Sequence, residues 1–196
     1  MYRIKVFFVV MMYPICLFGQ IELGGKIGCH HTNTAKGIGG KSYDSFVFGL
    51  TSSWKICNRL SINGDILFSK RGYVVEKGTY DAMSMVYKDC KVIFRYIDMP
   101  FLLEFNANNY LSLELGPYVG LQASRSLYFD NEKQKNSLLG KKQPFDMGVL
   151  MGVKGKYKGT FIEVLYQKGF TQSFKDVKGF NSTGVCVNIG YMFNLK

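Results

Sequence analysis

Residues 60–69 read LSINGDILFS, and large apolar side chains recur in this stretch at every second position, with polar ones between them. The apolar side holds Leu60, Ile62, Ile66 and Phe68, and the polar side holds Ser61, Asn63, Asp65 and Ser69. Alternation with a period of two predicts a β-strand with one apolar face and one polar face. The acid at position 65 shows that the polar face carries charge as well as small side chains.

The same alternation recurs along the chain and predicts seven further strands within residues 21–30, 46–54, 92–105, 111–122, 145–154, 162–167 and 183–193. Three connections, 55–59, 106–109 and 156–159, are tight polar turns. The others, 31–45, 72–89, 124–144 and 171–182, are long, and short and long connections alternate strictly. Outer-membrane barrels have this asymmetry, with short periplasmic turns and long outer loops.

The chemistry of the two faces decides which kind of barrel is expected. A soluble barrel would pack its aromatic side chains inside, but eight strands leave an interior just wide enough for side chains. Glycine, serine and paired charges fit that space better, and strands of about 9–11 residues cross a membrane when tilted. We therefore predict an all-β fold, an eight-stranded antiparallel up-and-down transmembrane β-barrel.

Charged residues on the polar face are expected to meet inside the barrel. Unpaired charge in so narrow a space is costly, so we predict a structural network of ion pairs. Its expected members are Lys26, Asp65, Arg95, Glu114, Asp146, Lys154 and Glu163. A small polar conduit is the alternative use of the same charges.

The first residues have the pattern of a secretory signal peptide. Arg3 and Lys5 precede the apolar run VFFVVMMYPICLF (6–18), and Gly19 is a small residue before Gln20. We expect a signal peptide at 1–19 and an outer-membrane β-barrel domain at 20–196. Lipidation at Cys16 is disfavoured by the bulky residues before it, and the run is shorter than the ~20 residues of a spanning helix.

Residues 95–105, RYIDMPFLLEF, contain an acid and a proline inside a predicted strand. Apolar residues occupy even positions at Val92, Phe94 and Tyr96, and odd positions from Met99 onward. A β-bulge shifts the phase by one and tolerates proline. We therefore predict a bulge at Asp98 and Pro100, with Asp98 turned into the lumen or the bulge near Arg95.

The last strand ends in Tyr191 and Phe193, which share the apolar face. An aromatic pair of this spacing at the end of an outer-membrane strand predicts a signal for the barrel-insertion machinery. Asn194, Leu195 and Lys196 follow the pair, a departure from a terminal aromatic residue.

No arrangement of residues in the sequence indicates catalysis, a metal site or a cofactor. His30 and His31 are adjacent, so on a strand they point to opposite faces and do not chelate one metal. Ser42, Ser45 and Ser53 lie nearby, but no local signature selects a nucleophile. Cys29, Cys57, Cys90 and Cys186 are scattered singly, which favours isolated small apolar residues over a disulfide framework or a metal site.

The formal charge of +11 makes the chain strongly basic. Outside the inner membrane, the nearest anionic partner is the phosphate-rich lipid of the outer membrane, including lipopolysaccharide. No basic cluster with interleaved aromatics points to nucleic acid. Residues 124–144, SRSLYFDNEKQKNSLLGKKQP, combine basic and apolar side chains that suit lipid phosphates or a protein partner; a solvated loop is the alternative.

Five segments in series resemble the PorT-type outer-membrane β-barrel family of Bacteroidetes. They are LSINGDILFSKRGY (60–73), YIDMPFLLEF (96–105), YLSLELGPYVGL (110–121), FDMGVLMGVKGKY (145–157) and NIGYMF (188–193). The resemblance implies an eight-stranded barrel in the outer membrane, and signal peptides of that group often end before glutamine. It implies no shared activity, because one namesake member is tied to protein secretion and gliding and most members have no assigned role.

The expected function is that of a non-enzymatic integral protein of the cell outer membrane. Its exposed loops would bind a partner or lipid, in a role as a secretion or envelope accessory. Two alternatives remain open: an outer-membrane lipid-modifying barrel enzyme, and a secreted soluble barrel that binds a small apolar ligand. The second lacks the early Gly-x-Trp signature of lipocalins.

Overall fold

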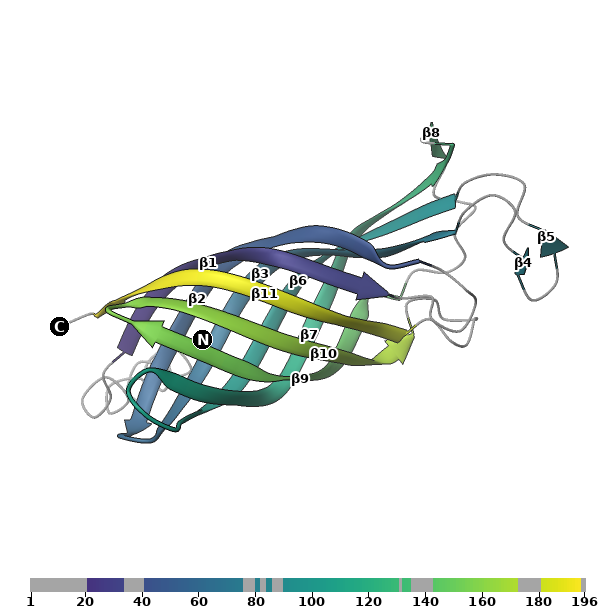
Figure 1. Cartoon of the computed structure of the whole chain (residues 1–196). Helices are drawn as coiled ribbons and strands as arrows, with labels where there is room; N and C mark the ends of the chain where they lie inside the picture. The colour runs from purple at the N-terminus through teal and green to yellow at the C-terminus, as the bar shows by residue number, and fades with distance from the viewer. Residues whose placement is uncertain are drawn as a thin grey trace, which may run out of the picture.

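Eight long antiparallel strands close into one barrel (Figure 1). The computed structural model describes residues 21–33, 41–75, 80–81, 84–85, 90–130, 132–134, 143–172 and 181–194. The barrel strands are β1 (Ile21–Asn33), β2 (Tyr43–Cys57), β3 (Leu60–Val75), β6 (Cys90–Asn106), β7 (Leu111–Phe129), β9 (Phe145–Tyr157), β10 (Thr160–Gln172) and β11 (Asn181–Asn194). Each pairs with its neighbours in the chain, and β1 pairs with β11 to close the barrel. The predicted fold class is confirmed.

Three short strands lie outside the barrel wall. β4 (Tyr80–Asp81) pairs with β5 (Ser84–Met85), and β8 (Glu132–Gln134) pairs with the end of β7. No helix among the described residues is long and apolar enough to cross a membrane. The predicted signal peptide, with Cys16, lies outside the described residues.

The two ends of the barrel differ in their connections. Turns at 58–59, 107–110 and 158–159 join consecutive strands at the end where β11 also finishes (Figure 1). Lys158 and Gly159 both have positive φ angles, 48° and 83°, as a two-residue type I′ hairpin requires. We call this the periplasmic end, because outer-membrane barrels have short periplasmic turns, and the opposite end the loop end.

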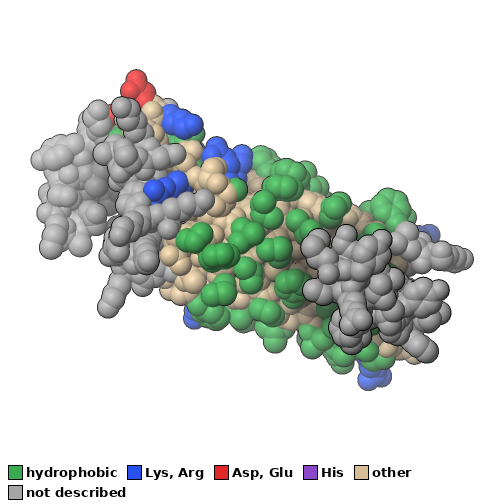
Figure 2. Space-filling model, turned by 180° about the vertical axis from the view of Figure 1, so that it is seen from behind, with side chains coloured by type: hydrophobic (Ala, Val, Ile, Leu, Met, Phe, Trp, Pro, Cys, Tyr) green, Lys and Arg blue, Asp and Glu red, His purple; other side chains and the backbone are tan. Residues whose placement is uncertain are grey.

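The outer wall carries a broad apolar belt (Figure 2). Leu50, Ile66 and Leu113 expose more than half of their surface, as expected only where lipid covers them. Positions of the other parity are buried in the lumen, including Asp65 and Glu114. The alternation in the sequence therefore separates a lipid-facing side from a polar interior.

The prediction of a bulge at Asp98 and Pro100 is wrong. Pairing of β6 with β7 keeps one register from Tyr96 to Asn106, and the register with β3 is the same on both sides of the proline. The shift in register lies between Arg95 and Tyr96, where Ala123 is the extra residue of β7. Because proline lacks an N–H, it removes a ladder hydrogen bond without moving the strand.

The change of apolar parity in β6 has another cause. Val92, Phe94 and Tyr96 point inward with Asp98, so even positions face the lumen throughout the strand. The three pack with Tyr73 and Leu127 into a buried apolar cluster near the loop end. The lumen thus changes from apolar to polar along one unbroken strand face.

Candidate functional sites in the lumen and at the outer rim

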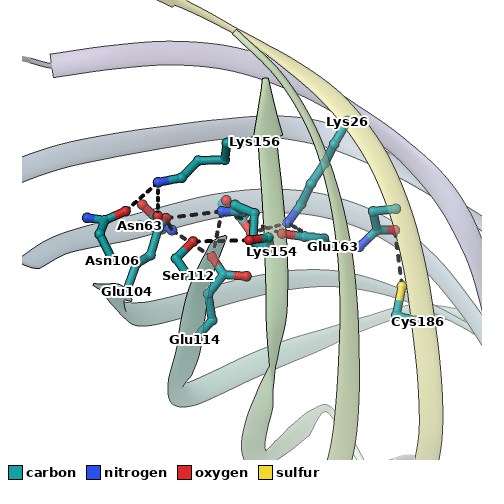
Figure 3. Close-up of polar contacts among 12 residues, drawn as sticks. Lys26, Asn63, Glu104, Asn106, Ser112, Glu114, Lys154, Lys156, Glu163 and Cys186 are labelled. Carbon is teal, nitrogen blue, oxygen red and sulfur yellow. Dashed lines mark hydrogen bonds and ion pairs between the residues drawn. The ribbon is translucent and has the colours of Figure 1, made fainter. Parts of the chain in front are cut away.

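The periplasmic half of the lumen is built around one lysine. The Nζ atom of Lys154, on β9, lies 2.5 Å from Glu114 Oε1, 3.3 Å from Glu104 Oε2 and 3.6 Å from Glu163 Oε2 (Figure 3). All four side chains are nearly inaccessible to solvent. Charges this deeply buried persist only when they are paired and hydrogen-bonded.

Neighbouring side chains extend this cluster across the barrel. Lys26 pairs with Glu163 and lies 2.7 Å from Asp65 Oδ2, while Lys156 pairs with Glu104. The Asn63 amide donates to Glu104 at 2.6 Å and to Glu114 at 2.8 Å. The ion-paired members come from β1, β3, β6, β7, β9 and β10, so the network bridges the lumen from wall to wall.

A second network lies nearer the loop end and is centred on Arg71. Its guanidinium is 2.5 Å from Asp98 Oδ1 and also pairs with Asp146. The rings of Tyr96 and Tyr118 lie 4.6 Å and 5.1 Å from the guanidinium carbon, so the cation lies between two aromatic faces. Arg71 is 1 % exposed and has both charge partners and aromatic partners inside the barrel.

Five of the seven residues predicted for the network meet around Lys154 and Lys26: these two lysines, Asp65, Glu114 and Glu163. Asp146 is also in the lumen, but it belongs to the second network, where it pairs with Arg71. The prediction that Arg95 belongs to the lumen network is wrong. Arg95 lies on the outward parity of β6, half-buried, and donates to Ser124 Oγ at 3.2 Å and Ser126 Oγ at 3.1 Å. Asp98 does face the lumen, but its partner is Arg71 rather than Arg95.

Sequence reasoning missed Arg71, Glu104 and Lys156 as network members. Arg71 falls at the boundary between a predicted strand and a predicted loop, whereas β3 continues to Val75. Glu104 alternates with Phe101, Leu103 and Phe105, a signal that would have placed it inside.

The two histidines lie on opposite sides of the barrel wall. His30 is buried in the lumen, while His31 is exposed outside and its Nδ1 lies 2.5 Å from Asp44 Oδ1. Among the described residues, neither imidazole has a serine or threonine hydroxyl as a hydrogen-bond partner. The described part of the chain also contains no group of three or more potential metal ligands. All four cysteines after residue 20 are free.

The outer rim carries basic side chains just beyond the apolar belt (Figure 2). Lys70 of β3 is exposed and directly opposite Arg95 of β6. It lies two residues beyond Phe68, which stacks on Phe48 with ring centroids 5.4 Å apart. Lys91 Nζ lies 5.1 Å from the ring centroid of Tyr43. We call Lys70, Lys91 and Arg95 the basic rim.

Comparisons with known proteins agree with this architecture. The profile of the outer membrane protein beta-barrel domain matches residues 18–178. The structure is similar to Ail, the attachment invasion locus protein of Yersinia pestis, with a TM-score of 0.51 at 13 % identity, over 89 % of this chain and 99 % of Ail. Neisserial surface protein A (NspA) gives a TM-score of 0.48 at 16 % identity, over 88 % and 97 %. No curated protein matches the chain.

The family match covers most of the chain, and the likeness to Ail extends over nearly all of that barrel. The apolar belt and the ion-paired lumen account physically for a wall that lies in lipid. The protein is located in the cell outer membrane, and the chain belongs to the outer membrane protein beta-barrel domain family.

Proposed function

We propose that this chain is a non-enzymatic integral outer-membrane protein whose basic rim binds the phosphate groups of lipopolysaccharide in the outer leaflet. The observation that carries the proposal is the direct pairing of Lys70 with Arg95 on the outer face. Like charges opposite each other on neighbouring strands destabilise a sheet. No carboxylate of the described residues forms an ion pair with either side chain, and a lipid phosphate would supply the missing anion.

The position of the basic rim suits this partner. Lys70 follows the lipid-exposed Phe68 by two residues, about 7 Å along the strand, which is the step from hydrocarbon to headgroup. Arg95 is held by two serine hydroxyls, so its guanidinium is oriented in the absence of an anion. Basic groups near an anionic membrane surface contribute about 1 kcal/mol each.

The non-enzymatic part of the proposal is supported by the histidines. A barrel hydrolase needs a histidine beside a nucleophile and an orienting carboxylate. His31 has the carboxylate of Asp44, but within the described residues no hydroxyl contacts its ring. His30 lies in the lumen, away from lipid.

The test is the double charge reversal Lys70→Glu/Arg95→Glu, with Lys55→Glu/Arg59→Glu at the periplasmic end as the control of equal charge change. Lipopolysaccharide bound per barrel is measured by native mass spectrometry after reconstitution in nanodiscs that contain it. We expect about tenfold weaker binding at the rim variant and unchanged binding in the control. Equal loss in both variants would show a general effect of net charge and would refute the proposal.

We further propose that the chain is of the PorT type from a Bacteroidetes envelope and acts as a secretion or envelope accessory. The five sequence segments above support this placement, and the loop end of β7, with the half-buried Tyr128, offers a surface for a protein partner. Affinity capture of the detergent-solubilised barrel tests the role. Recovery of no envelope or secretion component, with or without cross-linking, would contradict it.

We also propose that Tyr191 and Phe193 form the signal for the barrel-insertion machinery. Their rings meet edge to face at 4.8 Å on the lipid side of β11. The variant Tyr191→Ala/Phe193→Ala is expected to insert more slowly than wild type in vesicles that contain the machinery, and at an unchanged rate in vesicles without it. Equal slowing in both kinds of vesicle would assign the pair to barrel stability alone.

A further inference from the structure

The periplasmic mouth of the barrel holds a cavity of about 510 Å³. Its charged lining residues are Glu22, Lys55, Arg59 and Lys156. A smaller cavity of about 280 Å³ shares Glu22 and Lys156 with it and reaches inward to Lys154. Ligand sites typically occupy about 300–1,000 Å³, so the combined space, which we call the periplasmic cup, suits a small ligand.

The cup has an excess of positive charge. Lys156 pairs with Glu104, but Lys55 and Arg59 are exposed and form no ion pair with any described residue. Glu22 is half-buried and, within the same described part of the chain, also forms no ion pair. Lys158 lines the smaller cavity, is exposed and likewise forms no ion pair with a described residue. The cup therefore presents three uncompensated cations and one uncompensated carboxylate to a ligand.

Amide side chains supply further polar contacts in the cup. Asn58, Asn106 and Asn109 line the larger cavity and bring both donors and acceptors. Asn106 already accepts from Lys156 at 2.6 Å, which fixes its orientation. Tyr110 and Tyr157 line the smaller cavity and are mostly exposed. The amides can therefore bond to the N–H and C=O groups of a peptide, and the tyrosine rings supply apolar contact area beside them.

The inner end of the cup is closed. Glu104 and Lys154 line the smaller cavity and belong to the ion-paired network that bridges the lumen (Figure 3). A ligand that enters from the periplasm therefore stops at this network instead of passing through the barrel. Such a cup can bind the end of an extended ligand but cannot let the ligand pass through the barrel.

We propose that the periplasmic cup binds a peptide that carries carboxylates and a free amine, present in the periplasm as soluble acidic peptides and as the peptide stems of the cell wall. Lys55 and Arg59 would bind the carboxylates, and Glu22 the amine. The cup lies inside the barrel mouth, so a headgroup anchored in the surrounding bilayer would have to leave its leaflet to reach it. A water-borne peptide has no such barrier.

Calorimetry on the full barrel in detergent micelles tests the proposal with four probes. They are a soluble cell-wall disaccharide-tetrapeptide, a linear peptide with the same charged groups, the same peptide with amidated carboxylates, and inorganic phosphate. We expect the first two to bind, with about tenfold weaker binding to Lys55→Glu/Arg59→Glu and unchanged binding to Lys70→Glu/Arg95→Glu. Tighter binding of the disaccharide-tetrapeptide assigns the site to the cell wall, and equal binding assigns it to free peptides.

Three results would overturn the inference. One is equal binding of the amidated peptide, a second is displacement of the peptide by phosphate at the peptide's own concentration, and a third is unchanged binding to the cup variant. Glu22→Gln tests the contact with the amine by itself. This variant should bind the free-amine peptide more weakly than wild type does, and it should bind the N-acetylated peptide as tightly as wild type does. Fluorescence of the single tryptophan, Trp54, verifies that each variant is folded. Lipopolysaccharide binding at the basic rim is measured separately, so either proposal can fail alone.

Discussion

Replacing Lys154 with methionine is expected to lower the free energy of unfolding by about 3–5 kcal/mol, because removing one partner of a buried ion pair strands the other. Methionine has a similar length and no charge, so the change isolates the ammonium group. Three carboxylates lie within 3.6 Å of that group in the wild-type barrel.

The contacts of these carboxylates show where the loss arises. Glu104 keeps its ion pair with Lys156, and Glu163 keeps its ion pair with Lys26. Glu114 loses its one cation within the described residues and retains the hydrogen bond from Asn63 at 2.8 Å. The expected loss is therefore that of one stranded carboxylate and not of three.

Removing the charge of Glu114 should restore part of the lost stability. Glu114→Gln removes the stranded charge, so the double variant Lys154→Met/Glu114→Gln should be about 2 kcal/mol more stable than Lys154→Met alone, an interaction between neighbours that a double-mutant cycle isolates. Lys168→Met, on the exposed side of β10, is the control and should change stability by less than about 0.5 kcal/mol.

Equilibrium urea titration in phospholipid vesicles, followed by Trp54 fluorescence, measures five proteins: wild type, Lys154→Met, Glu114→Gln, the double variant and Lys168→Met. A loss below about 1 kcal/mol in Lys154→Met would refute the view that the lumen depends on this cation. Failure of the second substitution to rescue would show that the loss comes from packing around position 154 and not from Glu114.

Three further predictions follow from the barrel interior and one turn. Arg71→Met should lower the free energy of unfolding by about 3–5 kcal/mol, because two buried carboxylates lose their cation. Arg95→Met should lower it by less than about 1 kcal/mol in the same titration, and the reverse order would contradict the placement of Arg71 in the lumen. Phe94→Ala should lower the free energy of unfolding by about 3–5 kcal/mol, since this ring is fully buried in the apolar cluster. That loss should be clearly larger than the loss in Phe68→Ala on the lipid side, and equal losses would place Phe94 on the outside of the barrel. Gly159→Ala should cost about 1–2 kcal/mol because of its left-handed backbone, and an unchanged unfolding midpoint would exclude the type I′ turn.

Much of the barrel wall follows from local pattern. Strand β10 alternates without exception from Phe161 to Gly169, so Glu163 could be assigned to the lumen from the sequence. Side chains of a strand point to alternate faces whatever the strand pairs with. The same rule placed Lys26, Asp65, Glu114, Asp146 and Lys154 on the interior face before any partner was known.

The pattern was misleading where apolar residues face inward. Val92, Phe94 and Tyr96 have the composition of a lipid-facing stretch, yet they pack against Tyr73 and Leu127 in the lumen. Apolar character marks a side chain that avoids water, and both lipid and a packed interior meet that condition. In the first half of β6 the large apolar side chains face the lumen, and in the second half they face the lipid. The sequence shows this only as a shift of the apolar residues from even to odd positions.

The sequence by itself determined the number of barrel strands, their antiparallel order and the face of most charges, because alternation and turn length are local properties. The tertiary structure alone decided that Arg71 rather than Arg95 joins the lumen, that Lys70 lies opposite Arg95, and that Lys55 and Arg59 line one cup. These juxtapositions depend on the register between strands and on how far β3 and β6 extend. Register is set by the pairing of whole strands around a closed barrel, a property that no single stretch of the chain contains.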